Sequence, residues 1–180
     1  MDDYSKRIKK SIRSIPDWPK KGVVFRDLTT LWKDGKMLRG TTAAFYKRYR
    51  SKKIDKVLGV EARGFIVGAP LAERLGVGFI PARKIGKLPF EKIATTYDLE
   101  YSTAGIEVHS DAIAKGERIL IVDDLMATAG TALAAANLVE RLGGKVVGLA
   151  FVVELSFLGG RDKLKKFEIF SLAKYVSEAE

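Results

Sequence analysis

The chain has 180 residues, a length typical of one domain, and 47% of them are hydrophobic and 30% charged, as in ordinary globular proteins. The absence of cysteine excludes disulfides, thiolate metal sites and a cysteine nucleophile, and the single histidine, His109, excludes a two-histidine metal site. No apolar run approaches the roughly 18 residues of a spanning helix, and the N-terminal segment lacks the apolar stretch of a secretory signal. We therefore expect one cytoplasmic domain that has no membrane partner.

The positive charge is concentrated in the first third of the chain. Residues 1–53 contain 16 Lys and Arg against 5 Asp, whereas residues 54–180 contain 16 Lys and Arg against 17 acidic residues. Such an asymmetry is typical of a protein with a polyanionic partner, which could be nucleic acid, a membrane surface or a multiply phosphorylated small molecule. A basic face that only aids solubility is an equal alternative.

Helical spacing and short apolar runs predict the elements along the chain. In the first third, the pattern predicts a short helix that ends before Pro16, an extended segment at Val23–Phe25, and a second helix marked by Leu38, Thr41, Phe45 and Tyr49. Four apolar strands are then expected at Lys56–Val60, Val77–Ile80, Ile119–Val122 and Val146–Val153, with helices that end near Leu75 and span Thr131–Leu142. Near-continuous apolar strands separated by helices indicate a parallel sheet buried on both faces, so the fold class is α/β.

One segment departs from this alternation. Between Lys84 and Lys115, apolar and polar residues alternate on both sides of the turn composition Ser102–Gly105, which predicts a projecting antiparallel hairpin. A long excursion of this kind is either a functional lid or a poorly ordered loop.

The strand expected at Ile119–Val122 is followed by two acidic residues and a loop of small residues. Asp123 and Asp124 are expected at the carboxyl end of that strand, where open α/β sheets bind ligands. Two adjacent carboxylates repel each other, so a metal ion, a hydroxyl donor or a developing cation should lie beside them. The small residues Ala127–Thr131 allow backbone N–H groups to converge on an anion at a helix N-terminus. The alternative is a solvated strand end with Thr131 as a simple N-cap.

Residues Val122–Thr131 resemble the phosphoribosyl-pyrophosphate motif of type I phosphoribosyltransferases. Five further segments match this family in the same order: Ile15–Pro19, Gly22–Asp27, Val60–Phe65, Arg83–Pro89 and Tyr97–Tyr101. The resemblance implies a single domain over residues 1–180 with a central, mainly parallel sheet flanked by helices. A small N-terminal hood (residues 1–32) and a flexible hairpin lid (residues 84–110) would project from it.

The resemblance also implies an activity. It is the transfer of phosphoribose from 5-phospho-α-D-ribose 1-diphosphate to adenine, a reaction of purine salvage that gives AMP and diphosphate. The resemblance further implies that the reaction needs Mg²⁺ and that the protein is a homodimer. Two alternatives stay open: a phosphoribosyltransferase-like regulator that binds nucleic acid, and a transferase for another purine base. The basic first third favours the regulator, whereas the acid pair, Arg63 and Glu100 favour catalysis.

The same resemblance assigns the donor site. Asp123 and Asp124 would face the ribose hydroxyls, near a Mg²⁺ held mainly by the donor diphosphate and those hydroxyls. Arg63 would grip the diphosphate with the backbone at Ala62, where a cis peptide with Glu61 is expected. The 5′-phosphate is assigned to Ala127, Thr128, Ala129, Gly130 and Thr131, and neutralisation of phosphate charge to Arg83, Lys84 and Lys87.

The resemblance assigns the base site to the hood. Adenine would lie against Phe25 and Leu125, with the Val24 carbonyl accepting from its 6-amino group and the Arg26 amide donating to a ring nitrogen. The catalytic glutamate corresponds to Glu100, which is next to Tyr101. Two positions of the phosphate loop are distinctive: Ala127 stands where 6-oxopurine and orotate relatives carry an acid, and Ala129 replaces a common glycine. If residue 129 needs a positive φ, alanine is strained there.

Overall fold

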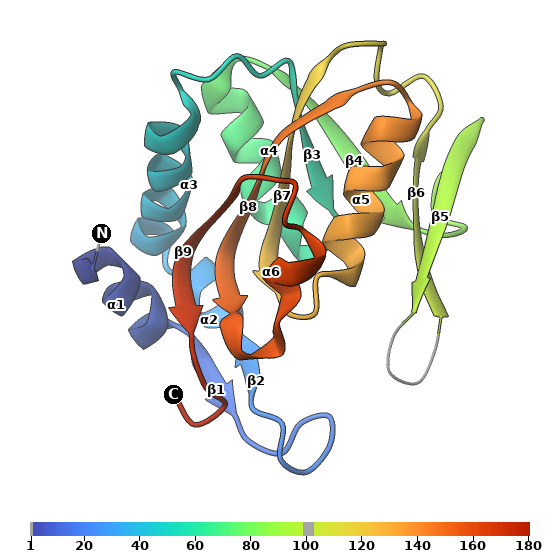
Figure 1. The fold of residues 1–180 in the computed structure, drawn as a ribbon. Coiled ribbons are helices and arrows are strands. Elements are labelled where there is room, and N and C mark those ends of the chain that lie inside the picture. The colour runs from blue at the N-terminus through green and yellow to red at the C-terminus, as the bar shows by residue number, and fades with distance from the viewer. Residues whose placement is uncertain (1, 99–102) are drawn as a thin grey trace.

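The computed structural model describes residues 2–98 and 103–180 (Figure 1). Within these ranges a central sheet contains seven strands in the order β5-β6-β4-β3-β7-β8-β9, and β1 and β2 form a separate antiparallel pair. The strands are β1 Arg13–Ile15, β2 Phe25–Asp27, β3 Lys56–Val60, β4 Gly78–Lys84, β5 Lys92–Asp98, β6 Thr103–His109, β7 Arg118–Met126, β8 Lys145–Leu155 and β9 Ile169–Tyr175. The helices are α1 Asp2–Ser11, α2 Thr29–Trp32, α3 Gly35–Tyr49, α4 Arg63–Leu75, α5 Gly130–Arg141 and α6 Gly160–Lys163, with a 3₁₀ turn, η1, at Ser156–Leu158.

The central sheet is mainly parallel, as the sequence predicts. Strands β4, β3, β7, β8 and β9 pair in parallel, and only the β5–β6 hairpin and its junction with β4 are antiparallel. Helix α4 packs on β3 and β7 on one face, next to α3, and α5 packs on the other face (Figure 1). The α/β class is therefore confirmed.

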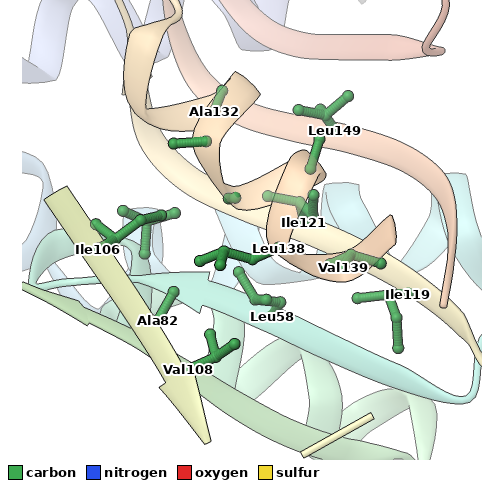
Figure 2. Packing of buried hydrophobic residues seen from close by; sticks show 14 of the residues in the cluster. Leu58, Ala82, Ile106, Val108, Ile119, Ile121, Ala132, Leu138, Val139 and Leu149 are labelled. Carbon is green, nitrogen blue, oxygen red and sulfur yellow. The ribbon is translucent and has the colours of Figure 1, made fainter. Parts of the chain in front are cut away.

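Each buried strand serves two hydrophobic cores because successive side chains point to opposite faces of a sheet. Leu58, Ile119 and Ile121 pack under α5, in the cluster shown in Figure 2. Val57 and Leu120 point to the other face and pack with α3 and α4. This two-sided burial explains why the strands are near-continuous apolar runs in the sequence.

Several boundaries differ from the prediction. Strand β7 continues through both acidic residues to Met126, because its pairing with β8 extends as far as the register Met126↔Glu154. Strand β2 starts at Phe25, so Val23 and Val24 precede it, and the chain after α1 forms the short strand β1. Strand β8 runs to Leu155, two residues beyond the predicted Val153, and is followed by α6 and β9, for which no prediction was made.

Two features project beyond the carboxyl ends of the parallel strands. The predicted hairpin is confirmed as β5 and β6, paired from Lys92↔His109 to Asp98↔Thr103. The turn expected at Ser102–Gly105 is wrong for residues 103–105, which belong to β6 because they pair with β5. Strands β1 and β2 lie at the same lower end of the molecule, close to the C-terminal residues (Figure 1). In the ranges 2–98 and 103–180, no helix has the length and apolar character needed to cross a membrane.

Candidate active site

The acid pair lies on β7, near the carboxyl ends of the parallel strands. Asp124 is buried, with 2% of its surface exposed, and Asp123 is half-buried. The backbone N–H of Asp124 donates to Asp123 Oδ1 over 2.8 Å, which fixes the Asp123 carboxylate against the strand. Because the strand continues past both residues, the two carboxylates are held by sheet pairing and not by a free strand end.

Arg63 neutralises the buried member of this pair. Its Nε lies 2.6 Å from Asp124 Oδ2, and the Arg63 side chain is 40% exposed. Asp124 Oδ2 nevertheless has no aligned hydrogen bond, so the contact is a charge pair that leaves an acceptor available. The Arg63 guanidinium also lies 5.8 Å from the centre of the Phe25 ring, which brings the hood to the acid pair.

Burial sets the protonation of the two carboxyls. Burial, and next the neighbouring Asp124 charge, raises the pKa of Asp123 well above its ordinary value. Burial also raises the pKa of Asp124, although the Arg63 guanidinium opposes this rise. The raised pKa values mean that the charged forms of these carboxyls are stabilised only in part by the protein, so a cation that develops beside them would stabilise the charged forms further.

The loop after β7 forms a cavity of about 150 Å³ at the start of α5. Asp123, Leu125, Phe151 and residues 126–132 line it. Ala129 is the N-cap of α5 and has φ +63°, so this position does need a positive φ and the alanine there is strained. Helix N-terminal N–H groups and the helix dipole make this cavity suited to an anion such as a phosphate.

Two glycines that the sequence reading missed hold this site together. A Cβ on Gly64 would lie 2.8 Å from the Val122 carbonyl oxygen, so α4 can approach β7 only without a side chain there. A Cβ on Gly160 would lie 2.3 Å from the Ala127 carbonyl oxygen, so α6 packs directly behind the loop. The only sequence signals were the glycines themselves, after Arg63 and in the pair Gly159–Gly160.

Two carboxylates hold the end of β4 and the loop that follows it. Glu61 accepts from Arg83 Nε and from the Lys84 N–H, at 3.3 and 2.8 Å. Burial raises the pKa of Glu61, but these hydrogen bonds outweigh it and lower the pKa overall. Buried Glu107 accepts from the Lys87 and Leu88 N–H groups at 3.0 and 2.8 Å.

The base-binding residues expected in the hood lie on and before β2. The rings of Phe25 and Trp18 meet edge to face, with centroids 4.3 Å apart. The Val24 N–H donates to Glu178 Oε1 over 2.6 Å, and the Arg26 side chain is buried.

The structure thus brings most of the expected site residues together at the carboxyl ends of the central strands. Asp123, Asp124, Arg63, Phe25 and the residues 127–131 meet there. The peptide between Glu61 and Ala62 is cis, as expected. Arg83 and Lys84 lie one strand further along, at the end of β4. Glu100 and Tyr101 lie outside the described residues.

The comparisons with known proteins agree with this arrangement. A family model, the phosphoribosyl transferase domain, matches residues 27–174. The adenine phosphoribosyltransferase of Desulfosudis oleivorans is 51% identical, over 95% of this chain and 99% of the relative. That of Solibacter usitatus is 54% identical, over 93% and 97%. The chain belongs to the adenine phosphoribosyltransferase family.

Solved structures of the adenine phosphoribosyltransferase family have the same fold. The enzyme from Thermoanaerobacter pseudethanolicus has a TM-score of 0.91 and 50% identity, and the match covers 94% of this chain and 99% of that one. The Saccharomyces cerevisiae enzyme, complexed with an imino-altritol bisphosphate and adenine, has a TM-score of 0.90 and 38% identity, with 96% and 99% covered. The type I phosphoribosyltransferase fold expected from the sequence is therefore confirmed.

Proposed function

We propose that this chain transfers phosphoribose from 5-phospho-α-D-ribose 1-diphosphate to adenine and forms AMP and diphosphate. The observation that carries the proposal is the Arg63–Asp124 pair, which lies between the Phe25 ring and the small-residue loop before α5. A base, a ribose and a phosphate need three adjoining sites, and these three features supply one each. The relatives named adenine phosphoribosyltransferase support the choice of reaction and of base.

The 5′-phosphate is assigned to the loop before α5. Its small side chains would allow the backbone N–H groups of residues 127–131 to approach the phosphate, and the hydroxyls of Thr128 and Thr131 can add donors. The exposed Thr128 and half-buried Thr131 are compatible with that role. Anchored in this way, the donor would present its C1 atom near the acid pair.

The acid pair would stabilise the transition state. When the bond between C1 and the diphosphate oxygen breaks, the diphosphate leaves with the electron pair and the sugar gains oxocarbenium character, as in glycoside hydrolysis. The carboxylates of Asp123 and Asp124 would stabilise that cation, and N9 of adenine would form the new bond to C1. Arg63, with the backbone at Ala62, would hold the leaving diphosphate, with Arg83, Lys84 and Lys87 supplying further positive charge.

Base selection is assigned to the backbone next to Phe25. A Val24 carbonyl that accepts from the 6-amino group of adenine would face a second acceptor in a 6-oxopurine, which is unfavourable. The Arg26 amide would donate to a ring nitrogen, and Leu125 would contact the base opposite Phe25. Because loop residue 127 is alanine, proton transfer from the base needs another group, and Glu100 is the residue we propose.

The donor set fits a magnesium ion that arrives with the donor. Mg²⁺ is usually held by one or two carboxylates together with substrate phosphates and water. The buried Asp124 Oδ2 lacks an aligned hydrogen bond, and Asp123 lies beside it. In the described ranges no cluster of three or more His, Cys, Asp or Glu side chains could hold a metal by itself. Bound there, the ion would neutralise diphosphate charge.

The proposal extends to assembly and organisation. We propose a cytoplasmic homodimer of one-domain subunits, with residues 1–32 as the hood and residues 84–110 as the lid. We place Ile66, Ile85 and Phe90, which are 37%, 49% and 74% exposed and belong to the six large apolar side chains exposed among the described residues, in the subunit contact. Sedimentation equilibrium tests the dimer, because a monomer at micromolar concentration would contradict it.

The activity is tested with purified protein, Mg²⁺ and the phosphoribosyl donor. Adenine, hypoxanthine and guanine are supplied separately, and nucleotide formation is followed by chromatography. We expect AMP from adenine and little product from the two 6-oxopurines. An Arg63→Met variant is the control for contaminating activity and should form at least 100-fold less AMP, on the order of a lost catalytic charge. A wild-type protein that forms no AMP would refute the proposed function.

A further inference from the structure

The last residues of the described chain return to the hood and bind the backbone next to Phe25. Glu178 contributes two separate groups: its carboxylate Oε1 accepts from the Val24 N–H over 2.6 Å, and its carbonyl oxygen accepts from Arg26 Nη2 over 2.8 Å. Val24 and Arg26 are the two chain neighbours of Phe25. One residue, more than 150 positions later, therefore holds the backbone of the residue before Phe25 and the side chain of the residue after it.

Arg26 is locked by further contacts around the same point. Arg26 is 3% exposed, and its guanidinium donates to Ser14 Oγ over 2.6 Å and stacks on the Tyr175 ring at 4.2 Å. Ser14 belongs to β1 and Tyr175 ends β9. The Arg26 side chain thus joins the hood, the edge strand of the sheet and the C-terminal residues.

The C-terminal segment, residues 176–180, is itself held in place. Glu180 Oε2 accepts from the Val176 N–H over 2.8 Å, which closes the segment into a turn, and Glu180 also forms an ion pair with Lys9 of α1. This segment lies beyond residue 174, where the match to the family model ends. Glu178 is therefore presented to the hood from a defined turn.

We propose that Glu178 is a positioning residue that sets the affinity for the purine base by fixing the backbone of residues Val24–Arg26. The inference rests on the proposed function, in which this backbone recognises adenine through the Val24 carbonyl and the Arg26 amide. Both interactions depend on the direction of the peptide groups, because hydrogen bonds weaken steeply when they are misaligned. Because both neighbours of Phe25 are held, the backbone of Val24–Arg26 loses conformational freedom before the base binds.

The test compares three variants by steady-state kinetics. Glu178→Ala removes the carboxylate, Glu178→Gln keeps an oxygen acceptor for the Val24 N–H, and Glu168→Ala is the matched control. Glu168 is an exposed glutamate paired with Arg48 and Lys52, away from the hood. We expect Glu178→Ala to raise the KM for adenine about 5- to 20-fold, the effect of one lost charge-assisted hydrogen bond, and to leave the KM for the donor unchanged. Glu178→Gln should recover most of the affinity, and Glu168→Ala should resemble the wild type.

A second measurement follows the contact itself without turnover. Amide hydrogen exchange at Val24 should be faster in Glu178→Ala than in the wild type and in Glu168→Ala. An adenine KM in Glu178→Ala within twofold of the wild type, an equal rise of both KM values, or unchanged exchange at Val24 would each overturn the proposal. Absence of AMP formation by the wild type would refute the proposed function instead, and this outcome is distinguishable because the exchange measurement does not need activity.

Discussion

Replacing Gly160 with alanine tests whether α6 supports the phosphate loop. The added Cβ would lie 2.3 Å from the Ala127 carbonyl oxygen and 3.2 Å from both the backbone nitrogen and the Cβ of Ala129. The backbone of Gly160 is not in the left-handed region, so alanine meets no conformational penalty of its own there. The substitution therefore acts on the loop through one steric contact.

The size of the effect follows from that contact. Ordinary contacts of a Cβ begin near 3.4 Å, so α6 or the Ala127 carbonyl must move by about 1 Å. Overpacking of this kind costs about 1–3 kcal/mol of stability. A 1 Å misplacement of a binding group can reduce catalysis about 100-fold, because reacting groups are held within narrow limits.

The assay is initial-rate kinetics with each substrate varied in turn, together with thermal unfolding. We expect Gly160→Ala to raise the KM for the phosphoribosyl donor at least about tenfold, with a much smaller change in the KM for adenine. Gly35→Ala is the matched control, because a Cβ at Gly35 meets no atom within 4 Å. An unchanged donor KM in a folded Gly160→Ala protein would refute the view that α6 positions the loop, and equal changes in both KM values would indicate general damage.

Three further predictions concern stability. Burial, and then the Asp124 charge, raises the folded pKa of Asp123, so the stability that this residue confers when protonated is lost as the pH rises from about 3.8. Asp123→Asn should therefore be more stable than the wild type at pH 7 and inactive. Urea unfolding that shows equal or lower stability would contradict this. Ala129→Val should cost about 1–3 kcal/mol because a β-branched residue is strained at φ +63°, and a wild-type midpoint of unfolding would argue against that strain. Burial raises the pKa of Glu154, but hydrogen bonds from Arg161 and Ser171 outweigh it and lower the pKa below its ordinary 4.5. The contribution of Glu154 to folding stability is therefore present above pH 4.5 and is lost as the pH falls through the folded pKa. Glu154→Gln should therefore lose about 1–2 kcal/mol at pH 7 and show a flatter acid limb of the stability profile, whereas a parallel profile would contradict the assignment.

The sequence predicted the framework of the fold because the framework depends on local patterns. Apolar runs such as Lys56–Val60 are long enough to identify buried parallel strands, and the small residues after Asp124 identify the anion loop. The end of β7 was predicted too early. A charged pair normally marks the end of an apolar strand, and here pairing with β8 and the cation of Arg63 keep both aspartates within it.

The parts of the site that the sequence did not predict depend on contacts between distant segments. Gly160 lies 33 residues after Ala127, and Glu178 lies 154 residues after Val24, so no local pattern relates them. Glu107 has an ordinary position in the alternating hairpin sequence, and only the folded chain brings its carboxylate to the N–H groups of Lys87 and Leu88. Packing of this kind is decided by tertiary structure and not by residue spacing.

The most direct test of the proposed site is a crystal structure of the protein grown with AMP. The account predicts that the phosphoryl group lies at the start of α5, within hydrogen-bonding distance of the backbone of residues 127–131, with the ribose next to Asp123 and Asp124 and the base against Phe25. AMP bound with its phosphoryl group away from Thr128 and Thr131 would contradict the account.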